Sequence, residues 1–506
     1  MIHRCDAPVT TLRSLQVPAI EGDTPTVVHL SAEYFPYART GGLAEAAWGL
    51  HRFQDRGGLQ TMAIVPLYRS ARQYLRQPEQ VGEAYSLRFN GREEWFRLWR
   101  DRDPASETPT CFIEHHEYFD RDGIYGEGGR DYPDNHRRFS AFAAAAVAAL
   151  PRITSGPILL HAHDWHAALA PVYLRTWWGG DPFFDRIPVV MSVHNGGYQG
   201  HFDGQVMPEL GLPWELYTPD RLEWYGKTNF LKGGLMYTDV ATTVSPAHAV
   251  ELRTDAGGFG LQEVYRWMGD RFTGVLNGID LDVWNPAHDE FTAAHYSRAD
   301  LSGKAACKAD MQQRFGLPLR PDIPVVALAG RMVTQKGLDL VIHNHALFQM
   351  SAQFIFLGSG EAKFEEAFAR LRGALPHRVA TETRFSDELE HVLMAGADLF
   401  LMPSQYEPCG LTQMRAQHYG TIPVARRVGG LADTIDDGQS GFLFDAFADR
   451  GLLGGMWRAM TEHGTPSAWL EMQHAAMAKD FGWARVAERY SALYAQAIAH
   501  RARRIS

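Results

Sequence analysis

The order of apolar and polar residues predicts a chain of alternating short strands and longer helices. Short runs rich in Val, Ile and Leu are each followed by a stretch with helical spacing of its apolar positions. Such runs are typical of parallel strands that are covered on both faces. The predicted strands span 26–32, 61–68, 158–162, 187–193, 325–329, 354–357, 399–402 and 422–425. Repeated units of this type predict an α/β protein with parallel sheets and helices on both faces.

Three segments add detail to this pattern. Residues 69–103 alternate in polarity and are rich in aromatic residues, which predicts an antiparallel insertion. The alanine-rich run that ends at Leu150 predicts a helix. The segment 231–252 reads as a helix, a strand and a second helix that starts at a Ser-Pro pair. All three fit within one α/β architecture.

The chain is too long for a single core. At 506 residues it exceeds the size at which hydrophobic cores stop growing. Gly, Asn and Pro interrupt the regular pattern over residues 274–289, so we place the boundary between two doubly wound domains there. We predict a loose polar leader over 1–25, one domain over 26–275, a second over 276–480, and a final helix over 481–506 that packs back on the first domain.

Charge and composition exclude several classes of partner. The formal net charge is −10, from 49 basic and 59 acidic residues, which argues against nucleic acid. No apolar run reaches the roughly 18 residues of a membrane-spanning helix, and the start of the chain lacks the apolar core of a signal peptide. The cysteines are scattered without metal-ligand spacing: Cys5, Cys111, Cys307 and Cys409. We therefore expect a cytoplasmic protein that does not bind membranes.

The stretch from Asp398 to Gly410 contains the main candidate for a functional carboxylate. A buried-looking strand ends there in a loop with a single carboxylate, Glu407, and a tight turn of Pro408, Cys409 and Gly410 follows. The next residues, starting at Leu411 and Thr412, predict a helix whose free N–H groups can hold a phosphate. The alternative is that Glu407 is only a carboxylate in the first turn of a helix, favoured by the helix dipole.

Two cations follow the strand 325–329. Arg331 and Lys336 flank the predicted start of the next helix, where they oppose the helix dipole unless an anion lies between them. A diphosphate suits them, because Arg offers a bidentate fork and Lys a point charge. The alternative is a pair of solvated surface cations. Both this loop and the Glu407 loop follow strand carboxyl ends, so we expect them at one edge of the sheet.

The first domain offers weaker signals. The pair Gly41-Gly42 lies between the first strand and a helix, where backbone N–H groups can approach an anion. The run HAHDWH, residues 161–166, raises the question of a metal site. A strand places His161 and His163 on one face and leaves Asp164 in the following turn, so we favour a hydrogen-bonding cluster at the strand end.

Nine motifs follow one another along nearly the whole chain after the leader. They are RTGGL (39–43), YPDNHRRF (132–139), HAHDWHAAL (161–169), VHNGGYQGHF (193–202), TTVSPAHA (242–249), LNGIDLDVWNP (276–286), GRMVTQKGLDL (330–340), YEPCGLTQM (406–414) and YGTIPVARRVGGLADT (419–434). In this order they resemble the bacterial glycogen synthases and plant starch synthases, which are retaining glucosyltransferases that extend an α-1,4-glucan. The resemblance implies two Rossmann-like doubly wound domains that face each other across a cleft, the GT-B arrangement.

The resemblance implies roles for individual residues and no cofactor or metal. Arg331 and Lys336 would neutralise the donor diphosphate, and Glu407 would lie beside the transferred glucose, as nucleophile or as electrostatic partner. His194 and Asp164 complete the implied catalytic set. The implied donor-binding residues are Arg39, Gly41, Gly42, Glu45, Asn195, Asn277, Phe385, Cys409, Gly410, Leu411 and Thr412, with Phe385 near the adenine.

The sequence departs from the family pattern in the first domain. Arg39 stands where the family usually has Lys, and Ala44-Glu45 replaces Gly-Asp. Gly196 and Gly197 replace bulkier residues after His194-Asn195. We hypothesise that Arg39 still reaches donor phosphate and that the longer Glu45 compensates for it.

The resemblance predicts transfer of glucose from ADP-glucose to the non-reducing end of an α-1,4-glucan such as glycogen. Two alternatives stay open at this point. One is a retaining nucleotide-sugar glycosyltransferase of the same fold with a different acceptor, because the departures lie on the acceptor side. The other is a non-catalytic glucan-binding scaffold, which the presence of Arg331, Lys336 and Glu407 disfavours.

Overall fold

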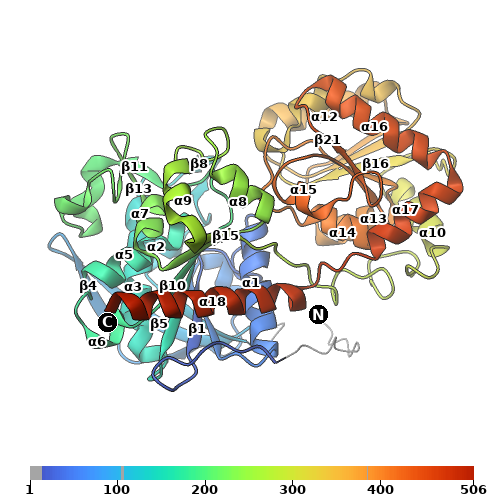
Figure 1. Cartoon of the computed structure of the whole chain (residues 1–506). Coiled ribbons are helices and arrows are strands. Elements are labelled where there is room, and N and C mark those ends of the chain that lie inside the picture. The colour runs from blue at the N-terminus through green and yellow to red at the C-terminus, as the bar shows by residue number, and fades with distance from the viewer. Residues whose placement is uncertain (1–13, 104–107, 385, 506) are drawn as a thin grey trace. The chain divides into compact units, whose positions relative to one another are not determined.

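The chain forms two compact units. The computed structural model describes residues 14–103, 108–384 and 386–505 (Figure 1). Unit 1 contains the chain up to Val244, the segment Ala249–Gly278 and the end of the chain from Trp483. Unit 2 contains Ser245–His248 and Ile279–Gly482.

Unit 1 is built on a ten-stranded sheet, with strand order β15-β14-β10-β9-β1-β2-β6-β5-β3 and β4 paired to β5. Strands β15 to β6 are parallel, whereas β3, β4 and β6 pair antiparallel with β5. The predicted antiparallel insertion is thereby confirmed. The bounds are β1 Thr26–Leu30, β2 Thr61–Pro66, β3 Glu79–Gln80, β4 Tyr85–Phe89, β5 Arg92–Arg102, β6 Pro109–Glu114, β9 Ile158–His163, β10 Val189–Val193, β14 Val240–Thr243 and β15 Phe272–Gly274.

Helices cover both faces of this sheet. Successive residues of a strand point to opposite faces: Val27 packs with α1 (Gly42–Arg56) and α18 (Trp483–Ile505), and Val28 packs with α3 (Asn135–Ile153) and α5 (Leu169–Thr176). Figure 1 shows α18, in red, running beside α1 in this unit. The last helix of the chain thus completes the core of unit 1. The shorter helices of this unit are α2 His116–Phe119, α4 Asp164–Ala167, α6 Pro182–Asp185, α7 Phe230–Tyr237 and α9 Gln262–Met268. The helix α8, Pro246–Leu252, begins in the segment Ser245–His248 of unit 2 and ends in unit 1.

Unit 2 has a fully parallel sheet of six strands in the order β18-β17-β16-β19-β20-β21. Val326 packs with α12 and α16, and its neighbour Val325 packs with α10 and α13 on the other face. Both units are therefore doubly wound, as the pattern predicts. The bounds are β16 Val325–Ala329, β17 Gln353–Leu357, β18 Val379–Glu382, β19 Leu399–Met402, β20 Ile422–Arg426, β21 Phe442–Phe444, α10 Gly303–Arg314, α12 Ala362–Ala374, α13 Asp387–Gly396, α14 Thr412–His418, α15 Gly429–Thr434, α16 Asp449–His463 and α17 Pro466–Met477.

The segment after β16 differs from the prediction. A helix was expected to start between Arg331 and Lys336, but Thr334–Lys336 is a 3-10 turn that ends at Gly337, and α11 covers only Asp339–Ile342. Arg331 and Lys336 therefore do not oppose a helix dipole as predicted, because the four-residue helix α11 begins after both cations and has little dipole.

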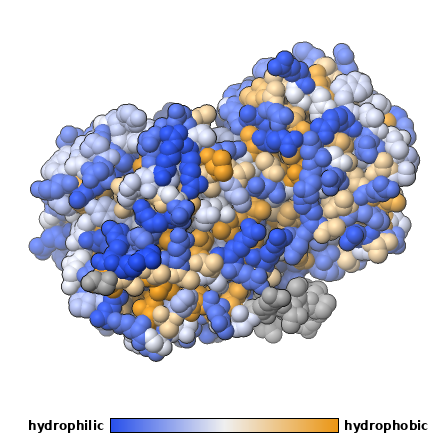
Figure 2. Space-filling view, viewed as in Figure 1, coloured by the Kyte–Doolittle hydropathy of each residue, from blue (hydrophilic) through white to orange (hydrophobic). Residues whose placement is uncertain are grey.

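The surface shown in Figure 2 is largely hydrophilic, with smaller hydrophobic groups scattered over both units. Among the residues that the structure describes, no helix combines the length and the apolar character needed to cross a bilayer.

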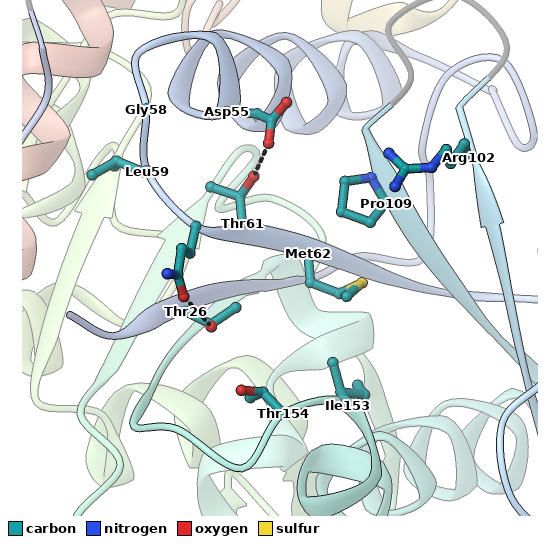
Figure 3. A pocket seen from close by; sticks show the side chains of 11 residues that line it. Thr26, Asp55, Gly58, Leu59, Thr61, Met62, Arg102, Pro109, Ile153 and Thr154 are labelled. Atoms are coloured by element: carbon teal, nitrogen blue, oxygen red, sulfur yellow. Dashed lines mark hydrogen bonds between the residues drawn. The ribbon is translucent and has the colours of Figure 1, made fainter. Parts of the chain in front are cut away.

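A hollow of about 530 Å³ opens in unit 1 (Figure 3). Thr26, Thr61 and Pro109 line it, and these are the first residues of β1, β2 and β6. The hollow therefore lies at the amino ends of the parallel strands. Ligands of open α/β sheets bind at the carboxyl ends, and the polar residues described next lie there.

Candidate active site

Glu407 is a buried carboxylate in the loop that follows β19. Its exposed fraction is 5%. Lys336 Nζ lies 2.6 Å from Glu407 Oε2, and Ser404 Oγ donates to the same oxygen at 3.0 Å. Since α14 begins only at Thr412, Glu407 does not lie in the first turn of a helix. The alternative that the helix dipole explains Glu407 is therefore excluded.

Gly337 brings Lys336 to this carboxylate. Its φ is 69°, and a Cβ atom there would lie 1.9 Å from the carbonyl oxygen of Pro403. The Gln405 N–H also donates to the Gln335 carbonyl at 2.8 Å. The loop after β16 is thus docked on the loop after β19, and Lys336 supplies the charge that a buried Glu407 needs.

The same edge of unit 2 carries the other predicted donor-binding groups. Arg331 follows β16, is exposed, and makes no ion pair with any residue that the structure describes. Gly410 has a φ of 72°, which starts the turn into α14, and no described side chain caps that helix. Cys409 is buried, while Leu411 and Thr412 are half-buried. Among the described residues, Arg331 therefore offers a guanidinium without an ion pair in the same loop as Lys336.

In unit 1, Asp164 holds the turn after β10. Its Oδ1 accepts the N–H groups of His194 at 2.6 Å and Asn195 at 3.3 Å. Burial raises the pKa of Asp164 to about 7, although the two backbone hydrogen bonds oppose this shift. The φ of Asp164 is 57°, a strained value for a residue other than glycine, and such strain is common at functional sites.

His194 is the first residue after β10. Its Nε2 lies 3.0 Å from His163 Nδ1, and burial lowers the pKa of His194 to about 3, so the ring is neutral. The Asn195 side chain accepts the Gly197 N–H at 3.0 Å. A Cβ on Gly196 would lie 2.7 Å from Leu252 Cδ2. This contact explains why a small residue stands where the family pattern has a bulkier one.

The loop before α1 contains an unexpected carboxylate. Glu33 accepts hydrogen bonds from the Thr40 N–H at 2.7 Å, the Gly41 N–H at 3.1 Å and the Tyr125 hydroxyl at 2.6 Å. The Gly41 N–H, expected to face an external anion, is therefore already used by the chain itself. Gly42 is the first residue of α1.

Arg39 and Glu45 lie beside this loop as an ion pair, with Nη2 and Oε1 2.9 Å apart. Both side chains are partly exposed, at 27% and 20%. The sequence alone did not predict this contact between the two substituted residues. The two substituted residues therefore pair with each other, and Glu45 balances the charge of Arg39.

Sequence reasoning missed Glu33 and Tyr125. Glu33 lies just after the first strand, so the strand-end argument used for Asp164 applied to it as well. Tyr125 lies 92 residues away in a loop, and no local pattern links it to Glu33. Its ring stacks on His166, with centroids 4.7 Å apart. This contact joins the Glu33 loop to the HAHDWH segment.

The possible metal cluster is an internal hydrogen-bonded group. His29, His161 and His163 have ligand atoms within 4.8 Å of one another, and all three are buried. Each of their six ring nitrogens has a hydrogen-bond partner within the chain. A metal ion would have to displace these bonds, so the geometry favours the predicted hydrogen-bonding cluster.

Two predicted donor-binding residues fall outside these groups. Asn277 is buried, one residue before the point where the chain leaves unit 1. Phe385 lies outside the described residues.

Comparisons with known proteins define the class and then the family. Two doubly wound units with cations and a carboxylate at the strand carboxyl ends are typical of glycosyltransferases with the GT-B fold. Residues 26–267 match the family model described as "Starch synthase catalytic domain", and residues 310–469 match "Glycosyl transferases group 1".

The chain is 40% identical to the glycogen synthase of Syntrophotalea carbinolica over 475 residues, which cover 92% of this chain and 98% of that protein. It is 41% identical, with the same coverage, to the glycogen synthase of Anaeromyxobacter dehalogenans (strain 2CP-1). The chain belongs to the family of bacterial glycogen synthases and plant starch synthases. The resemblance seen in the motifs is confirmed, and the function is that of a glycogen or starch synthase.

The structure agrees with this assignment. The catalytic domain of starch synthase IV from Arabidopsis thaliana, bound to ADP and acarbose, superposes with a TM-score of 0.87 at 31% identity, covering 94% of this chain and 100% of that one. Sucrose-phosphate synthase from Thermosynechococcus elongatus has a TM-score of 0.59 at 17% identity, a likeness of fold alone.

Proposed function

We propose that this glycosyltransferase transfers glucose from ADP-glucose to the non-reducing end of an α-1,4-glucan, with retention of configuration. The ion pair between Lys336 and Glu407 carries the proposal. It places a cation that can neutralise the leaving diphosphate next to an anion that can stabilise positive charge on the sugar. The Arabidopsis starch synthase, whose structure contains ADP and acarbose, supports the choice of donor and acceptor. Cys111, Cys307 and Cys409 are buried cysteines, which suits a reducing cytoplasm.

Arg331 and Lys336 neutralise the diphosphate. Arg331 is free to form a bidentate contact with phosphate oxygens, and Lys336 adds a point charge. Negative charge grows on the diphosphate as the bond to glucose breaks, so fixed cations there stabilise the transition state more than the ground state. The start of α14, with Gly410, Leu411 and Thr412, adds backbone N–H groups nearby.

Glu407 stabilises positive charge on the sugar. Cleavage of the donor leaves an oxocarbenium-like glucose, and the acceptor hydroxyl attacks on the face that the phosphate vacates. A phosphate oxygen takes the acceptor proton. The ion pair with Lys336 lowers the nucleophilicity of the Glu407 carboxylate, which favours an electrostatic role over a covalent one. A retaining hydrolase uses a pair of carboxylates at the reacting carbon, whereas we assign only Glu407 to this sugar.

In unit 1, the motif match assigns His194 to a sugar hydroxyl and Arg39 to donor phosphate. Asp164 holds the backbone of His194 and Asn195 in place. The remaining donor-binding assignments, Gly42, Asn277, Phe385 and Cys409, rest on the motif match alone.

The test is an assay with ADP-glucose or UDP-glucose and glycogen as acceptor. We expect ADP release matched by glucose incorporation, less reaction with UDP-glucose, and α-linked product by NMR. A β-linked product would contradict retention. ADP release without incorporation would instead favour a different acceptor, an alternative that the changes at Arg39, Gly196 and Gly197 motivate.

A further inference from the structure

A line of buried hydrogen bonds connects the C-terminal helix to His194. Gln54 of α1 donates through Nε2 to the Tyr494 hydroxyl of α18 at 2.9 Å, and its Oε1 lies 2.8 Å from His29 Nε2. His29 Nδ1 lies 3.1 Å from His163 Nε2, and His163 Nδ1 lies 3.0 Å from His194 Nε2. We call these five residues the His194 relay.

A second branch leaves the relay at Tyr494. Its hydroxyl lies 3.0 Å from His161 Nδ1, and His161 Nε2 lies 2.7 Å from Ser192 Oγ. The sheet register brings the branches together, because His29 pairs with His161 and Ser192 pairs with His163. All these residues except His194 are fully buried, so water does not interrupt either branch.

Each imidazole in the relay is neutral. Burial lowers the pKa of His29 to about 4 and that of His163 well below its ordinary value. A neutral ring carries one N–H donor and one lone pair, so the role of one nitrogen fixes the role of the other. The hydrogen bonds of the relay must therefore all run in one direction.

Gln54 sets that direction. Its Oε1 accepts, so His29 Nε2 carries the proton and His29 Nδ1 accepts from His163 Nε2. His163 Nδ1 then accepts from His194 Nε2, which leaves His194 Nδ1 bare. Tyr494 favours this orientation of the Gln54 amide. A phenol donates strongly to an imidazole lone pair, so the Tyr494 hydroxyl donates to His161 Nδ1 and accepts from the Gln54 amide N–H.

We propose that Gln54 and Tyr494 are positioning residues that act through His29 and His163 to keep the proton of His194 on Nε2. His194 then presents Nδ1 as an acceptor for a donor-sugar hydroxyl. This effect on catalysis rests on the proposed contact between His194 and the sugar. The predicted tautomer of His194 does not depend on that contact, because it follows from the hydrogen bonds of the relay alone.

The direct test is nitrogen NMR of the whole protein with ¹⁵N-labelled histidine. Protonated and bare ring nitrogens have well-separated shifts, and the spectrum of His194→Gln assigns the His194 signals. We expect a protonated Nε2 and a bare Nδ1 in the unaltered protein. A protonated Nδ1 would overturn the proposal, and this measurement needs no variant of the relay to fold.

Two variants then test the positioning role. Gln54→Met removes the acceptor for His29, and Tyr494→Phe removes the hydroxyl that holds Gln54. We expect each to move part of the His194 proton to Nδ1 and to lower kcat/KM about 3- to 10-fold, as for the loss of one hydrogen bond. Ser491→Ala is the control, since it removes a buried hydroxyl of the same helix that has no hydrogen-bond partner among the described residues.

The outcomes separate this inference from the proposed function. If Gln54→Met and Tyr494→Phe lose stability but leave the His194 signals unchanged, the residues are only structural and the inference fails. If His194→Gln keeps full activity while the tautomer is as expected, the relay stands and the sugar contact of His194 is wrong.

Discussion

Lys336 Nζ and Glu407 Oε2 lie 2.6 Å apart, although 71 positions separate the two residues. The ammonium is 24% exposed and the carboxylate 7%, so the pair is only partly open to solvent. An anion in such a place is stable only when it is paired. The ion pair therefore places Glu407, the anion that we assign to the sugar, next to Lys336, a cation that we assign to the diphosphate.

Replacement of Glu407 by Ala should lower kcat by about 10³-fold or more with little change in donor affinity, because the carboxylate acts in the transition state. Steady-state kinetics with ADP binding measured separately would test this. Glu407→Gln is the matched control for shape, and it should be nearly as inactive. Activity of Glu407→Ala within tenfold of the unaltered protein would show that the assigned role is wrong.

Arg39→Ala should cost about 2 to 4 kcal/mol in kcat/KM, the range for truncating one partner of a desolvated charged hydrogen bond. Arg39→Lys should recover part of this, because it keeps the charge but loses the planar fork. Adding Glu45→Asp to Arg39→Lys should restore more, since the shorter residues match each other. Unchanged kinetics of Arg39→Ala would make Arg39 a surface residue, and a double variant no better than Arg39→Lys would refute the compensation.

Gly337→Ala should destabilise unit 2 and reduce activity. The added Cβ would lie 1.9 Å from the Pro403 carbonyl oxygen at a φ that favours glycine, so the loop that carries Lys336 must shift. We expect a loss of at least about 2 kcal/mol in the free energy of unfolding. Gly454→Ala in α16 is the control, because its Cβ would have open space, and it should be neutral or slightly stabilising. Equal effects of the two variants would contradict the role of Gly337.

Stability should fall as the pH drops from about 6.5 to about 4. The pKa of His29 is lowered to about 4 and that of His161 well below 6.5, so in this window the unfolded chain binds protons that the folded chain does not. His29 alone would contribute about 3 kcal/mol, present above pH 6.5 and lost below it. Asp164, with its raised pKa, acts in the opposite direction up to about pH 7.

Urea unfolding of the unaltered protein and of His161→Gln at several pH values would test this dependence. The variant should show a smaller change of unfolding free energy across the window, because one group with a lowered pKa is gone. Parallel curves for the two proteins would mean that His161 does not contribute.

Activity should survive a strong chelator. Arg331 and Lys336 can screen the diphosphate, and all six ring nitrogens of His29, His161 and His163 are hydrogen-bonded within the chain. The measurement is glucose incorporation before and after chelation. Loss of activity that zinc or magnesium restores would instead favour a metal at HAHDWH.

The sequence by itself determined the architecture. Strands such as Val325–Ala329 and Leu399–Met402 coincide with the predicted ranges, because fully buried parallel strands appear as continuous apolar runs. The family followed from motifs, and Glu407 stood out because it follows such a strand. These signals are local, so they are readable without contacts between distant residues.

Only the tertiary structure decided which side chains meet. The turn at Gly337 replaced the expected helix because the chain must approach Pro403 closely, a constraint that is not local to the loop. Glu33 took the Gly41 N–H, and Tyr494 joined Gln54 across 440 positions. Apolar periodicity fixes the face of a strand or helix, but a hydrogen bond between distant polar residues depends on where the folded chain brings their atoms.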